Sequence, residues 1–263
     1  MIEIEKEKRY KIEYLFKNAH DTVILTCLQG HMGRAFTDDL QNPTCAMIQG
    51  GDFCFLNGDI TKESTNELIS QILNLIERPL AFVITDNRDI GDRIEQIFGE
   101  NCKKIKRYSI KKKKDEFNLE YLRAIVDQLP NEYTLSPINE TWYDEALRET
   151  WSKDFVSNFL SREDYLNRGI GRVITYNGKI ISGASSYTIY NDGIEIEIGT
   201  REEFRNKGLA QIVGAALILA CREKGLYPSW DAANLTSVHL AERLGYEYDK
   251  PYDTYMLRRA VEQ

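Results

Sequence analysis

The residues from Glu195 to Gln211 have the types and the spacing to hold a phosphate-bearing cofactor beside a catalytic carboxylate. Three isoleucines alternate with Glu195 and Glu197, so a strand over Ile194–Thr200 would have one apolar face and one face with two carboxylates. The strand would thus have a core side and a working side that carries Glu195 and Glu197.

A turn with small and basic residues follows this strand and precedes an apolar run, Ile212–Ala220, of helix-forming composition. The first N–H groups of a helix have no partner within the helix, and with the helix dipole they attract anions. Small side chains let the backbone approach a diphosphate. The sequence therefore predicts a pyrophosphate cradle formed by Arg205, Asn206, Lys207, Gly208, Leu209 and Ala210. The alternative is an ordinary strand, turn and helix with solvated charges.

A second pattern begins at Asn234, a good N-cap residue, and ends at Gly245, a good C-terminal stop for a helix. Together the two patterns resemble the Gcn5-related N-acetyltransferase (GNAT) superfamily. In that family a strand leads into Gln/Arg-x-x-Gly-x-Gly/Ala and a helix, and an Asn is followed eleven and twelve residues later by Gly-Phe/Tyr. The matching residues are Arg205, Gly208 and Ala210 for the first motif, and Asn234, Gly245 and Tyr246 for the second.

The resemblance covers Glu132–Arg258 and implies an acetyl-CoA-dependent N-acetyltransferase. It implies direct attack on the thioester by a primary amine, with a small-molecule amine as the favoured acceptor. The family mechanism also implies a general base that takes a proton from the ammonium group, directly or through water, and Glu197 and Glu195 are the candidates, especially if burial raises the pKa of the carboxyl group. Both could instead be exposed strand carboxylates. Backbone groups of the strand would pair with the pantetheine arm and stabilise the oxyanion, and the cradle would hold the pyrophosphate. The cofactor-binding residues expected beside the cradle are Ile198, Gly199, Thr200 and Asn234.

One position departs from the family pattern. Many members have a Tyr seven residues after the Asn, where it protonates the departing thiolate, and here that position is Ala241. Three explanations stay open: Tyr246 or another nearby Tyr replaces it, solvent protonates the thiolate, or the chain is catalytically weak. The last explanation leads to a second hypothesis, in which the protein is a non-catalytic acyl-CoA-binding regulatory module.

The chain of 263 residues is long enough for two domains. We expect an α/β (α+β) protein, with an N-terminal α/β domain over residues 1–130 and a GNAT domain over residues 131–263. The GNAT fold implies a mixed, mostly antiparallel central sheet flanked by helices. In the N-terminal domain Thr22–Leu28 is expected as a strand and Ala46–Leu56 as a second strand interrupted by Gly50-Gly51, and the order of elements could be that of a degenerate half-copy of the GNAT fold.

Two N-terminal segments, Arg34–Met47 and Gly51–Asp59, resemble a bacterial two-domain GNAT subgroup that includes zwittermicin A resistance acetyltransferases. A role in antibiotic resistance is therefore one candidate. The first domain could close over the acceptor site, or it could serve as a packing domain or a dimer surface. In the second domain Trp142, Trp151 and Phe155 lie where the acceptor-binding helices of the family fall, and they line a pocket or fill the core.

Composition and charge limit the partners. A net charge of -7 argues against nucleic acid and permits a cationic amine, and the Lys111–Lys114 run beside two acidic residues is typical of a solvated turn. No membrane span or secretory signal is visible, which predicts a cytoplasmic protein. Five cysteines without a Cys-x-x-Cys pair indicate reduced thiols and no metal site. A homodimer stays open.

Overall fold

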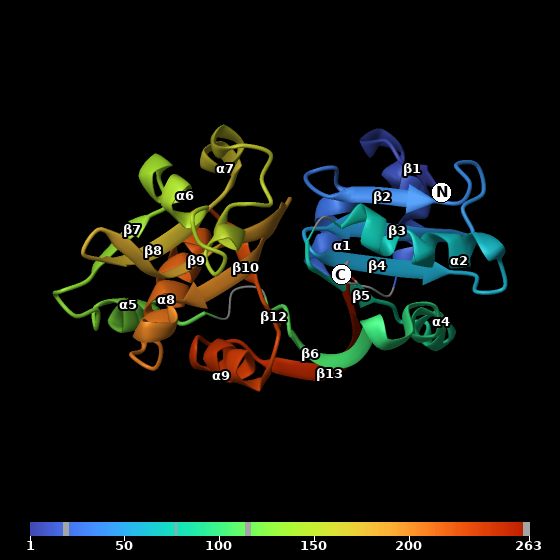
Figure 1. The fold of residues 1–263 in the computed structure, drawn as a ribbon. Coiled ribbons are helices and arrows are strands. Elements are labelled where there is room, and N and C mark those ends of the chain that lie inside the picture. The colour runs from blue at the N-terminus through green and yellow to red at the C-terminus, as the bar shows by residue number, and fades with distance from the viewer. Residues whose placement is uncertain (18–20, 77, 114–116, 260–263) are drawn as a thin grey trace. The chain divides into compact units, whose positions relative to one another are not determined.

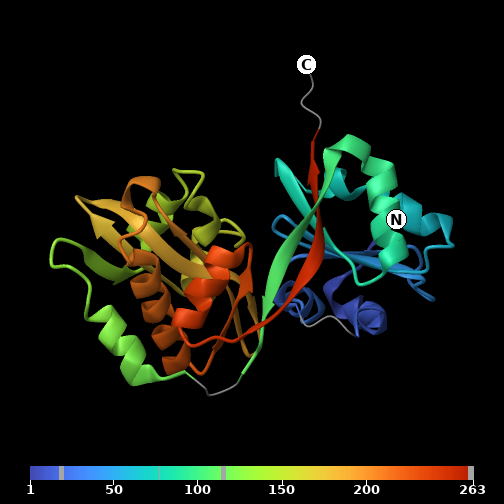
Figure 2. The ribbon, with the colours of Figure 1, turned by 90° about the horizontal axis from the view of Figure 1, so that it is seen from below.

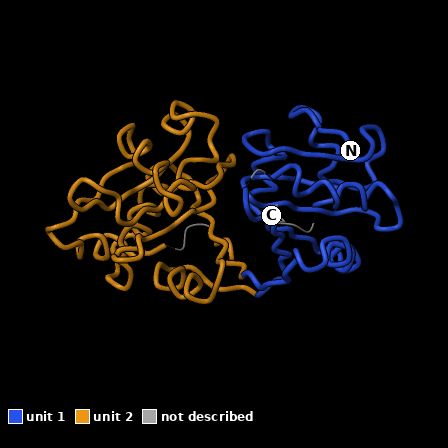
Figure 3. Tube along the Cα trace, viewed as in Figure 1, with its two compact units in different colours: residues 1–107, 251–263 blue, residues 108–250 orange. Residues whose placement is uncertain are grey.

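The computed structural model describes residues 1–17, 21–76, 78–113 and 117–259. It divides into two compact units, residues 1–107 with the chain from 251 onward (unit 1) and residues 108–250 (unit 2), as Figure 3 shows. The boundary expected from the sequence lay at residue 130. The units divide the chain elsewhere because α5 (Leu119–Val126) packs on a helix of unit 2 and because the strands β6 (Cys102–Ile110) and β13 (Tyr248–Arg258) each run through both units.

Unit 1 is a mostly antiparallel sheet with helices on its faces (Figure 1). Its strands follow the order β1-β2-β3-β4-β5-β13-β6, and β4 and β5 pair in parallel. The elements are β1 (Ile2–Glu3), η1 (Lys6–Phe16, a 3-10 helix), α1 (Thr22–Leu28), β2 (Arg34–Thr37), β3 (Cys45–Gly50), β4 (Phe53–Gly58), α2 (Glu63–Ser70), α3 (Ile72–Leu75), β5 (Leu80–Ile84), α4 (Arg88–Phe98) and η2 (Gly99–Asn101).

The core of unit 1 lies between the sheet and the helices α2, α3 and α4. Met47 and Leu56 of the sheet, Leu68 of α2 and Ile94 of α4 are all nearly inaccessible to solvent. A buried apolar stripe on each helix explains why these segments form and stay on the sheet, because apolar burial is the main stabilising term in folding.

Thr22–Leu28 is a helix, α1, so the strand expected there is wrong. Three β-branched residues at its start favour a strand by propensity. However, the side chain of Asp21 accepts a hydrogen bond from the N–H of Val23 at 2.8 Å and caps a helix. The helix buries most of its residues against β3, with Val23 packed on Gly50. Tertiary burial therefore overrides a local preference that is worth only tenths of a kcal/mol per residue.

Unit 2 contains a five-stranded sheet in the order β11-β10-β9-β8-β7, in which only β10 and β11 pair in parallel. The mixed α/β class with mostly antiparallel sheets is thus confirmed. Its elements besides α5 are β7 (Thr134–Pro137), α6 (Glu140–Ala146), η3 (Lys153–Phe155), α7 (Arg162–Arg168), β8 (Gly171–Tyr176), β9 (Lys179–Tyr190), β10 (Gly193–Thr200), η4 (Glu202–Phe204), α8 (Leu209–Glu223), β11 (Tyr227–Ser229), β12 (Asp231–Ala232) and α9 (Leu235–Arg243).

The sheet of unit 2 separates two sets of helices. Helix α8 lies along β8, β9 and β10 with α5 beside it, as Figures 1 and 2 show. On the opposite face α6 and η3 pack on β9. The hairpin of β8 and β9 turns at Asn177 and Gly178, whose positive φ angles of 48° and 72° are those of a two-residue turn. This arrangement gives β10 one face toward α8 and one toward η3.

Candidate active site

Strand β10 presents its two carboxylates on the face that is turned away from α8. Ile194 is fully buried, and Ile198 packs against Gly214 of α8. The alternate residues Glu195 and Glu197 are half-buried and lie opposite Thr188 and Ser185 of β9. The strand therefore has the apolar and the polar side that its alternation predicts.

Strands β10 and β11 separate half-way along β10. Their parallel pairing ends at Glu195 and Ser229, whereas the pairing of β10 with β9 continues to Thr200. The register with β9 shifts at the same place, between Glu195 and Ile196, because β9 has one extra residue, Tyr187. The second half of β10 therefore has β9 on one side and has left β11 on the other.

The separated half of β10 directs backbone groups away from β9. The N–H of Arg201 donates to Ile181 O at 2.9 Å. Because backbone groups in an antiparallel pair point alternately toward and away from the partner strand, Gly199 also faces β9, and Ile198 and Thr200 face the other way. An extended chain with amide groups, such as a pantetheine arm, could form hydrogen bonds with these two residues.

The turn between β10 and α8 leads the chain into the helix through two left-handed residues. Asn206 has a φ of 61°, and Gly208, the N-cap of α8, has a φ of 77°. A Cβ placed on Gly208 would have no heavy atom within 4 Å. There is thus open space beside the N-cap of this 15-residue helix, and a pyrophosphate in that space would lie near the first N–H groups.

The side chains of the turn frame that space. Arg205 and Lys207 are exposed, and Lys207 Nζ lies 4.9 Å from the centre of the Phe204 ring. Arg205 Nε donates to Thr200 O at 3.3 Å, which ties the turn to the end of β10. Leu209 is buried in the unit and Ala210 is half-buried, so the helix start is anchored in the core beneath the turn.

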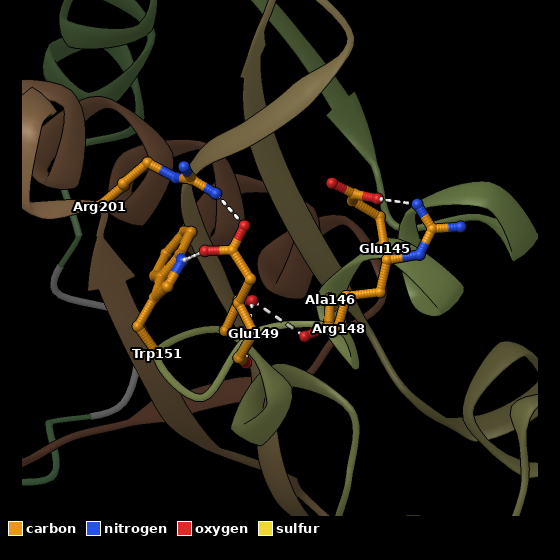
Figure 4. A network of polar contacts seen from close by, with 7 residues as sticks. Glu145, Ala146, Arg148, Glu149, Trp151 and Arg201 are labelled. Atoms are coloured by element: carbon orange, nitrogen blue, oxygen red, sulfur yellow. Dashed lines mark hydrogen bonds and ion pairs between the residues drawn. The ribbon is translucent and has the colours of Figure 1, made fainter.

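A polar cluster lies on the carboxylate-bearing side of β10, beyond its last residue. The carboxylate of Glu149 forms an ion pair with Arg201 and accepts a hydrogen bond from Trp151 Nε1 at 2.8 Å (Figure 4). The Nε of Arg201 is buried and forms no hydrogen bond within the described part of the chain. The cluster therefore connects the segment after α6 to the strand that precedes the turn.

A glycine lets one aromatic ring lie directly on this part of the sheet. A Cβ on Gly183 would lie 2.4 Å from Phe155 Cε2, whereas one on Gly199 would lie at an ordinary van der Waals distance, 3.5 Å, from Trp151 Cε3. Phe155 is fully buried and Trp151 is partly exposed. Phe155 thus fills the core, whereas Trp151 covers the strand beside the Glu149 and Arg201 pair.

The GNAT acetyltransferase family model matches residues 13–255. The chain belongs to this family. It is 40% identical to a GCN5-related N-acetyltransferase-like protein from Streptococcus suis 89/1591, whose crystal structure superposes with a TM-score of 0.88 over 96% of this chain and 99% of that chain. It is also 25% identical over 266 residues to the uncharacterized N-acetyltransferase YdfB of Bacillus subtilis (strain 168), with 96% of this chain and 97% of that protein covered.

A more distant likeness concerns the fold alone. A tandem GNAT protein from the clavulanic acid biosynthesis pathway is 9% identical, and its structure matches with a TM-score of 0.57 over 98% of this chain and 97% of that chain. The family match makes this protein an N-acetyltransferase and confirms the resemblance seen in the two motifs.

The second GNAT motif has clear local roles in the fold. Asn234 caps α9 by accepting a hydrogen bond from the N–H of Ser237 at 3.0 Å. Gly245, with a φ of 99°, ends the helix segment in a left-handed conformation. These contacts explain the motif structurally, and contact of Asn234 with a cofactor stays a prediction.

The two residues that bear on the missing GNAT acid are both buried. Ala241 is fully inaccessible, on a helix that packs on α8. The hydroxyl of Tyr246 donates to Pro228 O at 2.6 Å, and its ring packs against Phe117 and Trp230. Burial raises the pKa of Tyr246 well above its ordinary value, which keeps the hydroxyl protonated. The proposed role of Tyr246 as proton donor to a thiolate stays a prediction.

Sequence reasoning missed Glu149 and Arg201. Arg201 follows Glu195, Glu197 and Gly199 at intervals of two, so the strand period alone could have placed it on the same face. Glu149 lies outside any strand or helix and carries no comparable signal.

The lysine run has structural partners. Lys111 and Lys113 both form ion pairs with Glu247, and Lys112 Nζ lies 5.3 Å from the Tyr190 ring centre. Lys114 lies outside the described residues. These contacts within unit 2 support a role for the run in joining β6 to the start of β13.

Within the ranges that the structure describes, none of the helices has the length and apolar character needed to cross a bilayer. Among the same residues, histidines, cysteines and acidic side chains do not gather in groups of three that would hold a metal ion.

Proposed function

We propose that the protein is an acetyl-CoA-dependent N-acetyltransferase that acetylates a primary amine, most simply that of a small molecule, by direct attack. The observation that carries the proposal is the continuous path from the separated half of β10 to the open N-terminus of α8. One end of this path offers strand-type backbone groups, and the other offers helix N–H groups to an anion.

The cofactor would lie along this path. Ile198 and Thr200 would pair through their backbones with its pantetheine arm, with Gly199 between them. The amides of the cradle, residues 205–210, would hold the pyrophosphate, with Asn234 nearby. When bound, acetyl-CoA supplies a thioester carbonyl as the acetyl donor. A backbone N–H in the Ile198–Thr200 segment would donate to that carbonyl oxygen and stabilise its developing charge.

Glu197 is the favoured general base. It lies two residues beyond the last pair of β10 with β11, where the strands separate, whereas Glu195 lies within the paired part beside Ser229. The Glu197 carboxylate would take a proton from the ammonium group of the acceptor, directly or through water, so that the amine attacks in its neutral form. Glu195 remains the second candidate on the same face.

The proton for the thiolate has no assigned donor. Tyr246 holds its proton against Pro228 O, and Ala241 has no acidic hydrogen to give. A thiol with a pKa of about 8.5 is a good leaving group even without an acid. Protonation by solvent is therefore the simplest route consistent with these residues.

Glu149, Trp151 and Arg201 would contact the part of the acceptor that lies away from its amine. Arg201 lies four residues after Glu197, which corresponds to about 13 Å of extended chain. A long or branched acceptor could span this distance. A cytoplasmic location, homodimer formation and a link to antibiotic resistance remain predictions.

The test combines binding and turnover. Calorimetric titration with acetyl-CoA and with CoA measures the cofactor site, and release of free thiol across a panel of amines measures transfer. We expect Glu197→Gln to slow thiol release by about 10²–10⁴-fold, the usual contribution of a general base, with an unchanged Kd for CoA. Glu195→Gln, on the same face two residues earlier, is the matched control and should retain most activity.

The second candidate function is a non-catalytic acyl-CoA-binding regulatory module, which the alanine at position 241 favours. It predicts acetyl-CoA binding without thiol release for every amine in the panel. In that case Glu197→Gln would change nothing measurable, whereas turnover that depends on Glu197 would exclude the module.

A further inference from the structure

We infer that unit 1 is a second copy of the acyltransferase fold and that the whole chain binds one CoA. In unit 1 the cofactor channel, meaning the position that corresponds to the separated half of β10 and the N-terminus of α8, is closed. The inference goes beyond the proposed function, on which it rests only for the identity of the ligand. It is carried by the topology of the two units and by the contacts that occupy the channel position in unit 1.

The two units repeat one order of elements. Each begins with a strand that pairs antiparallel to the next one, and helices lie between these two strands in the sequence. A three-stranded antiparallel meander follows, β2 to β4 in unit 1 and β8 to β10 in unit 2. Then come two helices, α2 and α3 in unit 1 and η4 and α8 in unit 2, and a strand that pairs in parallel with the end strand of the meander over three residues. Agreement in order, pairing and direction across five strands indicates a duplicated fold.

The last strands of the two units also correspond. In unit 1 the end of β13 pairs antiparallel with β5, with Tyr255 opposite Val83. In unit 2 the end of β6 pairs antiparallel with β12, with Ser109 opposite Asp231. The correspondence is partial, because β12 lies outside the five-stranded sheet and is separated by Trp230 from β11, the strand that pairs in parallel with β10.

The helix after the parallel strand repeats its caps as well. The side chain of Asn87 accepts hydrogen bonds from the first N–H groups of α4, as Asn234 does for α9. Gly99 follows α4 with a φ of 50°, as Gly245 follows α9 with a φ of 99°. Unit 1 thus repeats the Asn cap and a glycine after the helix but not the motif itself, because Gly99 lies twelve residues after Asn87 rather than eleven and is followed by Glu100.

In unit 1 side chains bridge the end of β4, which corresponds to the separated half of β10 in unit 2. Beyond the last parallel pair, Phe55 with Ile84, the side chain of Asn57 donates to Asp86 Oδ1 and to Leu15 O, both at 2.8 Å. The pairing of β3 with β4 also runs without the register shift that marks β9 and β10. The backbone edge that would face a pantetheine arm is thus covered by contacts within unit 1.

In unit 1 a carboxylate occupies the turn that corresponds to the pyrophosphate cradle of unit 2. The turn from β4 to α2 has four residues, Asp59 to Lys62, and its helix begins after Lys62 rather than a glycine. The Asp59 carboxylate accepts hydrogen bonds from the N–H of Thr61 at 2.9 Å and from its hydroxyl at 2.7 Å. A negative charge that already uses the turn donors repels a pyrophosphate. Unit 1 therefore lacks the electrostatic and conformational features of the cradle in unit 2.

The experiment is a calorimetric titration of the full chain with CoA, compared between Gly208→Trp and Lys62→Trp, which change the N-cap residue of the corresponding helix in each unit. We expect the unaltered chain and Lys62→Trp to bind one CoA per chain with the same Kd, and Gly208→Trp to bind none. Thermal melting checks that each variant is folded. If Gly208→Trp does not fold, Gly208→Asn gives the same test, because Asn tolerates left-handed backbone.

Binding of two CoA molecules per chain would overturn the inference while leaving the proposed function intact. The same conclusion would follow if Gly208→Trp still bound CoA and the addition of Lys62→Trp to that variant removed the residual binding. A complete lack of CoA binding by the unaltered chain would instead overturn the proposed function, and with it the single site in unit 2.

Discussion

Replacement of Gly208 by valine separates the cofactor role of this glycine from its conformational role, because the same helix contains a matched control. Gly208 precedes α8 with a φ of 77°, and Gly225 follows it with a φ of 70°. A Cβ on either glycine would have no heavy atom within 4 Å. An L-residue in left-handed backbone costs about 1–2 kcal/mol. Both variants should therefore lose a similar free energy of unfolding.

Only the Gly208 variant should lose affinity for CoA. A hydrogen bond from a backbone N–H to a charged oxygen contributes about 1.5–3 kcal/mol. If the valine side chain keeps the pyrophosphate from two such donors, the loss of about 3–6 kcal/mol raises the Kd about 10²–10⁴-fold. The opposite end of the helix has the wrong dipole for an anion, so Gly225→Val should leave the Kd unchanged.

The assay is calorimetric titration with CoA together with urea unfolding of both variants. An unchanged Kd in Gly208→Val, with the fold intact, would refute the cradle. An equal loss of affinity in Gly225→Val would show that the effect comes from destabilisation of α8, and not from contact with the phosphates.

Three further predictions concern the structure around the site. Phe155→Ala should reduce the free energy of unfolding by about 3–5 kcal/mol, because the ring is fully buried on the sheet; urea unfolding checks this against Leu160→Ala, which removes a 91% exposed side chain and should be close to neutral. Ala241→Tyr should cost about 1–3 kcal/mol by overpacking a site with no exposed surface, and should not accelerate thiol release; a stable variant with faster turnover would contradict this. Hydrogen bonds from Lys111 and Lys113 lower the pKa of Glu247 from 4.5 to about 2. A carboxyl group with a lowered pKa in the folded state stabilises it above pH 4.5, and this stabilisation is lost as the pH falls toward 2. Melting temperatures of the unaltered chain and of Glu247→Gln should thus converge across that interval, and a constant difference would contradict the assignment.

The sequence alone was sufficient for the parts of the site that depend on local geometry. The alternation around Glu195 and Glu197 predicted the two faces of β10, because the strand period is a property of the backbone. The small residues and charges at 205–210 predicted a turn before a helix, and Gly208 has the left-handed conformation that such a turn requires. Asn234 caps α9 as expected. Each of these inferences uses interactions between residues close in the chain.

Other features were decided by tertiary contacts. Thr22–Leu28 has strand-like residues yet forms a helix, because burial against β3 outweighs propensity. The ion pair of Glu149 and Arg201 joins residues 52 positions apart, and neither residue predicts the other. The division of the chain at residues 107 and 250 arises because the end of β6 pairs with β12 in unit 2 and the end of β13 pairs with β5 in unit 1.

The difference between the two units likewise has a part that the sequence predicts and a part that only tertiary contacts determine. The sequence could suggest a repeated order of strands and helices, since order follows from local patterns. Closure of the channel position in unit 1 depends on Asn57, Asp86 and Leu15, three residues that only the folded chain brings together. Local backbone geometry thus determined the elements and the cradle motif, whereas long-range packing determined which unit presents an open path to a ligand.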